Sequence, residues 1–192
     1  MSNYKQFHDR AINKLKGLPV DKSTFCPLPF VHVSTMPHGE VKLCCRAQPP
    51  QNDRNPYVTD PDFNLKDYWH SDYMNNIRDD LILGNKNFQC KNCWKMEDNE
   101  IVSLRMNRIM DLMENEIYRK NIEYYLTHRE IEFKIPLIEL KLSNVCNFKC
   151  RMCWPKDSSK WVTDWDKVKE FYSVGDKRYI EEIVESNDLR KT

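Results

Sequence analysis

The distribution of apolar and polar residues predicts a β-hairpin and one further strand. Residues 30–35 are mostly apolar and rich in β-branched side chains, and residues 40–45 alternate between apolar and polar. The Pro-His-Gly sequence at 37–39 lies between these two segments and is typical of a turn, so the two segments are expected to pair. Residues 137–142 alternate in the same way, and their isoleucine and leucines would share one face of a third strand.

Apolar residues spaced three and four apart predict helices in most of the remaining chain. Residues 47–64 are an exception, because they are rich in Pro, Asn and Asp and are expected to form a loop. Gly84 is predicted to end the second helix as a C-cap. We expect an α+β fold, with helices over 4–16, 65–83, 94–129, 161–171 and 179–186.

Composition and charge narrow the class of protein. The 192 residues include 30 Lys and Arg against 29 Asp and Glu, so no charge excess points to nucleic acid or to an anionic membrane. The mean hydropathy is −0.76, no run approaches the length of a membrane span, and the N-terminus lacks the apolar core of a signal peptide. Eight cysteines without such a signal favour a reducing compartment and metal binding. We therefore predict a cytoplasmic protein.

Three cysteines follow the third predicted strand in the pattern CxxxCxxC, at Cys146, Cys150 and Cys153. Three thiolates so close together cannot all pair as disulfides, but they can bind three irons of one cubane iron–sulfur cluster. A fourth cysteine would close such a cluster, whereas three leave one iron open for an outside ligand. A structural zinc loop, or buried thiols at chance spacing, is the alternative interpretation.

A strand followed by CxxxCxxC resembles the signature of the radical SAM enzymes. In that family the open iron is chelated by S-adenosylmethionine (SAM), whose reductive cleavage gives a 5′-deoxyadenosyl radical. The resemblance implies that the chain is an enzyme, that Cys146, Cys150 and Cys153 bind a 4Fe–4S cluster together with SAM, and that a flavodoxin or ferredoxin donates electrons. The family usually has an aromatic residue before the third cysteine, where this chain has Met152.

The first half of the chain contains a second group of cysteines. The ends of the predicted hairpin bring Cys26 close to the Cys44–Cys45 pair, and Cys90 and Cys93 form a CxxC pair suited to neighbouring positions on one metal or cluster. Adjacent residues of a strand point to opposite faces, so only one of Cys44 and Cys45 can easily join Cys26. Four thiolates bind either zinc or an iron–sulfur cluster, and the residues alone leave both open.

This first half is similar to the twitch and SPASM domains, which carry auxiliary clusters in many radical SAM enzymes. The matching positions are Cys26, Gly39 with Cys44, Trp69 and Arg78 on a helix, and Cys90 with Cys93. The resemblance implies that Cys26, Cys44, Cys90 and Cys93 hold an auxiliary 4Fe–4S cluster, with Cys45 as a spare thiol.

The two resemblances predict two domains, an auxiliary-cluster domain over 1–130 and the first strand and helices of a β/α barrel over 131–192. A barrel of this kind needs on the order of 200 residues, more than the chain has after Cys153. The glycine-rich segment that binds the SAM amino group is also missing, and Gly175-Asp176 does not replace it. We therefore expect an incomplete barrel, from a truncated or split product or from a chain that a second chain completes.

Two other classes of function are open. The chain could be a non-enzymatic iron–sulfur electron-transfer fragment, or a zinc-binding interaction module built on its first four cysteines. Glu97, Ser103 and Arg105 follow the CxxC pair closely, and a charge pair there could tune a cluster, but we expect them on a solvated helix face. The five histidines show no ligand spacing and are predicted to be structural or surface residues.

Overall fold

The computed structural model describes residues 3–50, 55–141, 143–155 and 157–171. These residues form two compact units, one from Met1–Ser34 with Val41–Glu139 and one from Thr35–Glu40 with Leu140–Thr192. The predicted helix over 179–186, the pair Gly175-Asp176 and the last position of the predicted strand, Leu142, lie outside the described residues.

A three-stranded sheet lies in the first unit, which gives the mixed α+β fold expected from the sequence. Its strands are β1 (His32–Thr35), β2 (Val41–Lys42) and β3 (Leu137–Glu139), in the order β2-β1-β3. The turn predicted between β1 and β2 is confirmed: Gly39 donates its N–H to the Met36 carbonyl, and its φ of 96° is a conformation that glycine adopts without strain. β3 pairs with β1 in parallel, with His32 opposite Leu137.

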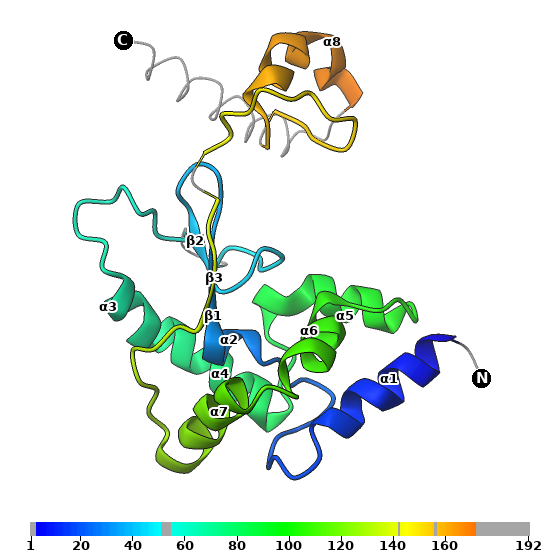
Figure 1. Cartoon of the computed structure of the whole chain (residues 1–192), viewed down its shortest axis with the longest axis vertical. Helices are drawn as coiled ribbons and strands as arrows, with labels where there is room; N and C mark the ends of the chain where they lie inside the picture. Colours follow the sequence, from blue (N-terminus) through cyan, green and yellow to red (C-terminus); the bar gives the residue numbers. More distant parts are fainter. Residues whose placement is uncertain (1–2, 51–54, 142, 156, 172–192) are drawn as a thin grey trace. The chain divides into compact units, whose positions relative to one another are not determined.

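The helices of the first unit gather around one end of this sheet and along one side (Figure 1). α1 packs against α6, and the short α2 packs against α4 and α7. Their apolar faces form one buried core that includes Phe25, Phe30, Trp69 and Ile109. The helices of this unit are α1 (Asn3–Lys14), α2 (Leu28–Val31), α3 (Leu65–His70), α4 (Asp72–Leu83), η1 (Phe88–Cys90), α5 (Lys91–Asp98), α6 (Leu104–Leu112) and α7 (Glu116–His128).

Two of the predicted helices are divided in the structure, because side chains cap new helix starts within them. The stretch 65–83 becomes α3 and α4 at Ser71, whose hydroxyl accepts the N–H of Met74. The stretch 94–129 is not one helix but three, α5, α6 and α7. Ser103 caps α6, and Asn115 caps α7 by accepting the N–H of Ile117. The C-cap predicted at Gly84 is confirmed, with φ 93°.

The second unit contains the CxxxCxxC segment and short helical turns. These are η2 (Ser159–Asp164), α8 (Trp165–Val168) and η3 (Lys169–Phe171), so the helix predicted over 161–171 is present only as a 3₁₀ turn, one α-helical turn and a second 3₁₀ turn. Within the part of the chain that is described, no helix combines the length and the apolar character that crossing a membrane requires.

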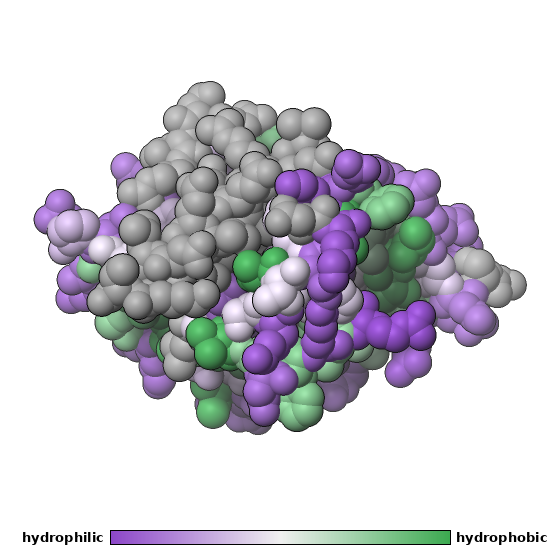
Figure 2. All heavy atoms as spheres, turned by 90° about the horizontal axis from the view of Figure 1, so that it is seen from above, coloured by the Kyte–Doolittle hydropathy of each residue, from purple (hydrophilic) through white to green (hydrophobic). Residues whose placement is uncertain are grey.

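The face drawn in Figure 2 carries mainly hydrophilic residues among its coloured atoms, with hydrophobic side chains between them. Large apolar residues that are more than half exposed include Leu83, Ile101 and Ile117. Scattered exposed apolar side chains of this kind are common on folded proteins and do not by themselves mark an interface.

Candidate metal centres

Four cysteines from three separate segments line one cavity in the first unit. Cys26 comes from the loop before α2, Cys44 from the segment after β2, and Cys90 and Cys93 from η1 and α5. All four are buried, with 6% to 9% of each residue exposed. The other lining residues are Leu28, Leu43, Arg46, Ala47, Gln89, Leu104 and Arg105. These are the four residues that the sequence assigned to an auxiliary metal centre.

Local backbone structure explains how the CxxC pair reaches one cavity. Asn87 begins η1 by accepting the N–H of Gln89, and Cys90 ends η1 and precedes the first residue of α5. Cys93 follows three residues later on α5, and residues three apart lie on the same face of a helix. The two thiols therefore face the cavity together because of the local helical geometry alone.

Backbone N–H groups are directed at the cavity sulfurs. Leu28 donates to Cys26, Arg46 and Ala47 donate to Cys44, and Arg105 donates to Cys93. Donors at these positions stabilise a thiolate more than a thiol, because the charged sulfur is the stronger acceptor. These donors partly offset the effect of burial on the pKa of the cavity cysteines.

Burial nevertheless keeps these sulfurs protonated when no cation is bound. It raises the pKa of Cys44 to about 12, and it raises the pKa of Cys26 and Cys90 as well. In Cys26 and Cys90 the negative charge of the neighbouring cavity thiolates raises the pKa further. A bound metal or cluster would supply the positive charge that makes four neighbouring thiolates stable together.

Cys45 is directed elsewhere. It is partly exposed and lines a neighbouring cavity of the first unit with His32, Arg108 and Glu139. Cys44 is thus the member of the pair that lines the cavity with Cys26, but strand alternation is not the reason, because β2 ends at Lys42 and both cysteines follow it in a bend and turn. His32 is buried, and its Nδ1 lies 2.9 Å from the Leu43 carbonyl oxygen. This contact gives the imidazole a structural partner.

The expectation that Glu97, Ser103 and Arg105 lie on a solvated helix face is wrong. Only 2% of the Arg105 side chain and 12% of the Glu97 side chain are exposed. Arg105 Nε donates to Glu97 Oε1 at 2.9 Å, Nη2 donates to Oε2, and the Ser103 hydroxyl donates to Oε1. The apolar spacing did not indicate this burial, because the α5–α6 break that turns these residues inward depends on the cap at Ser103.

Two buried arginines hold the segment that carries Cys26. Arg105 Nη1 donates to the Phe25 carbonyl at 2.9 Å, and Arg78 Nε donates to the Pro29 carbonyl at 2.9 Å. These carbonyls lie on either side of Cys26 in the chain. The resemblance to twitch and SPASM domains implied Arg78 as a matching position, but its contact with the Cys26 segment is visible only in the fold.

The three cysteines of the CxxxCxxC loop lie together in the second unit. Cys153 donates its backbone N–H to the Cys150 carbonyl at 3.1 Å, and Phe148 N–H lies 3.4 Å from Cys146 Sγ. Desolvation, and then the negative charge of a Cys150 thiolate, raise the pKa of Cys153. Cys150 is exposed, and Met152 is 92% exposed. The thiols are therefore gathered in one open loop.

Buried polar contacts close this loop at its base. Asn144 is 3% exposed, and its Nδ2 donates to the Pro155 carbonyl at 3.0 Å. Ser158 is fully buried and donates its hydroxyl to the Phe148 carbonyl at 2.7 Å. These bonds join the two ends of the cysteine segment, so that Cys146 and Cys153 are held near each other.

Among the described residues, no three His, Cys, Asp or Glu side chains are arranged to hold a single metal ion.

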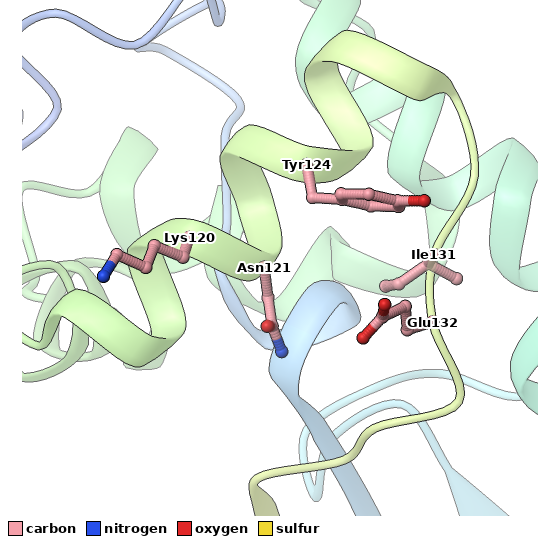
Figure 3. A pocket seen from close by; sticks show the side chains of 5 residues that line it. All are labelled: Lys120, Asn121, Tyr124, Ile131 and Glu132. Atoms are coloured by element: carbon pink, nitrogen blue, oxygen red, sulfur yellow. The ribbon is translucent and has the colours of Figure 1, made fainter.

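A third cavity lies between α7 and the segment that follows it. Figure 3 shows Tyr124 above Ile131 and Glu132, with Lys120 pointing away from them. Its lining carries no thiol or imidazole, so we do not consider it a metal centre.

Comparisons with protein-family models, with curated proteins and with solved structures give no significant match. The functional argument for this chain therefore rests on its cysteines and their surroundings.

Proposed function

We propose that this chain is an iron–sulfur protein of the radical SAM type. Cys26, Cys44, Cys90 and Cys93 would hold an auxiliary 4Fe–4S cluster, and the CxxxCxxC loop would hold a second cluster with one iron open to SAM. The observation that carries the proposal is that four buried cysteines from three distant segments line one cavity.

The surroundings of these sulfurs support a resident cofactor. A pocket of four buried thiols that exists only for packing would need no N–H donors on the sulfurs, yet Cys26, Cys44 and Cys93 each receive at least one. Hydrogen bonds to cysteine sulfur and exclusion of water are the means by which proteins stabilise a cluster and set its potential.

The proposal takes a cluster over zinc because the matching cysteine pattern extends over most of the first half of the chain. A single zinc ion needs four sulfurs at about 2.3 Å from one point, whereas a cubane holds its cysteines around a group of eight atoms. The four thiols line one cavity, and the sulfide content of the protein decides between the two occupants.

The three loop cysteines would hold a different kind of cluster from the four buried cysteines. Three ligands leave one cluster iron without a cysteine, and the exposure of Cys150 and Met152 leaves this side of the loop open to a ligand such as SAM. When bound, the cluster and SAM would supply the radical chemistry. This chain's own residues would hold three irons, keep the loop closed through Asn144, and receive electrons from a flavodoxin- or ferredoxin-type donor.

The decisive experiment measures iron, acid-labile sulfide and zinc in anaerobically reconstituted protein. It is combined with electron paramagnetic resonance (EPR) of the reduced sample before and after SAM is added. About eight irons per chain and a SAM-dependent change in the signal are expected for two 4Fe–4S clusters. Zinc without sulfide would contradict the proposal and favour a zinc-binding module.

A second candidate function, electron transfer without SAM chemistry, is favoured by the closed set of four buried ligands. A cluster with four cysteines has no open iron, and it can only exchange electrons or support the fold. This function predicts about four irons per chain and no response of the EPR signal to SAM.

A further inference from the structure

Three polar side chains next to the four-cysteine cavity form a buried network. Arg105 lines the cavity itself, and its guanidinium is held by both oxygens of Glu97. Burial alone would lower the pKa of Arg105, but the hydrogen bonds and the charge of Glu97 outweigh it and raise that pKa. Arg105 therefore stays charged beside the cavity.

The network is connected directly to one of the cavity sulfurs. The backbone N–H of Arg105 and the hydroxyl of Ser103 are both within hydrogen-bonding reach of Cys93. The same Ser103 oxygen contacts Glu97 Oε1 and accepts the N–H of Met106 as the cap of α6. Ser103 therefore links the carboxylate of Glu97 to the sulfur of Cys93 through a single oxygen atom.

Charges held in this way act strongly on a neighbouring redox group, because the low local dielectric and the absence of solvent ions leave them poorly screened. Reduction of a cluster adds one negative charge. Arg105 therefore favours the reduced state and Glu97 opposes it, and the Ser103 hydroxyl, which donates its one proton to Glu97, weakens the effect of that carboxylate.

We infer that Glu97, Ser103 and Arg105 set the reduction potential of the cluster in the four-cysteine cavity, with Glu97 and Arg105 as opposing charges. The inference rests on the proposed function, because it needs a cluster at this site. It assigns a task to three residues that bind no iron themselves. They act on the cluster through the charges and hydrogen bonds that they hold beside the cavity.

The test is a redox titration of the reconstituted full chain, followed by visible absorption and EPR. E97Q leaves the Arg105 charge uncompensated, so the ratio of reduced to oxidised cluster at a fixed potential should increase about tenfold, a shift of about 59 mV for one electron. R105Q should shift the potential in the opposite direction, and the double variant should return toward the wild-type value. A merely structural role would not produce opposite signs that cancel.

D98N is the matched control. It removes the same charge one residue away, but the Asp98 side chain is 63% exposed, so its effect should be screened and small. If E97Q and D98N shift the potential equally, the inference is overturned. If E97Q fails to fold, S103A decides the matter: it changes no charge and should lower the potential, and an unchanged potential in S103A overturns the inference.

Metal analysis of the same samples separates the two levels of the argument. If the samples contain iron and sulfide but the potential is the same in E97Q, S103A and the wild type, the inference is overturned and the proposed function stands. Zinc without sulfide would overturn the proposed function and the inference with it.

Discussion

The guanidinium carbon of Arg78 lies 4.6 Å from the centre of the Trp69 ring, and Nη1 of the same side chain donates to the Trp69 carbonyl at 2.8 Å. Arg78 is completely buried, and burial lowers its pKa to about 10. Its Nη2 has no hydrogen-bond partner among the described residues. The rings of Trp69 and Tyr125 lie close to the guanidinium and stabilise its positive charge through cation–π contacts. This contact joins α3, α4 and the Cys26 segment.

Replacing Arg78 by Met should destabilise the first unit by about 2–4 kcal/mol, because the buried carbonyls of Pro29 and Trp69 lose their donors. Denaturant unfolding measures the change. R129Q is the control, since the Arg129 side chain is 53% exposed and pairs with Asp79 at the surface, and it should cost less than about 1 kcal/mol. Equal losses in the two variants would contradict the structural role of Arg78.

Cys44 and Cys45 offer a matched pair for the buried centre. C44S should remove about half of the bound iron, because Cys44 lines the four-cysteine cavity and serine is a poor ligand for a cluster. C45S should retain the wild-type iron and sulfide content, since Cys45 lines the neighbouring cavity. Loss of iron in C45S alone would mean that the ligand of the pair has been wrongly assigned.

Asn144 is predicted to affect only the cluster that the CxxxCxxC loop binds. N144A removes the hydrogen bond to Pro155 that joins the ends of the loop, so iron should fall from about eight to about four per chain and the SAM-dependent EPR change should vanish. N147A, at an exposed position of the same loop, should leave both measurements unchanged. A full iron content in N144A would show that the loop holds its cluster without this bond.

Tyr125 should give the fold a pH dependence in the alkaline range. It is 2% exposed, and burial raises its pKa to about 12, helped by the hydrogen bond that its hydroxyl donates to Asp79. The unfolded chain loses this proton near pH 10, so the stability contributed by Tyr125 is complete below pH 10 and is lost as pH rises toward 12. Y125F should flatten this part of a stability–pH curve measured by urea unfolding, whereas Y124F, at an exposed tyrosine, should not.

The division of the 94–129 stretch can be tested at the start of α7. N115A should cost about 1 kcal/mol of stability, because Asn115 Oδ1 accepts the Ile117 N–H at the start of the helix. N115D keeps an acceptor and should stay within a few tenths of a kcal/mol of the wild type. A stabilising effect of N115A would indicate that the helix continues through this position, as the apolar spacing alone had predicted.

The sequence by itself determined the features that depend on neighbours a few residues away. The turn at Gly39, the C-cap at Gly84 and the shared face of Cys90 and Cys93 follow from backbone preferences and helical spacing, and the structure has all three. The closeness of the cysteines within CxxxCxxC is of the same kind. Short-range geometry leaves few alternatives for such patterns, so they can be predicted without the rest of the chain.

Only the tertiary structure decided what depends on contacts between distant segments. The parallel pairing of β3 with β1, the meeting of Cys26 and Cys44 with the CxxC pair, and the burial of Glu97 and Arg105 bring together residues that no local pattern connects. The apolar spacing also could not reveal the helix starts at Ser103 and Asn115, because a single side-chain cap ended a periodicity that otherwise continued. Packing chose these arrangements, since the energy of burying a segment depends on every surface that it meets.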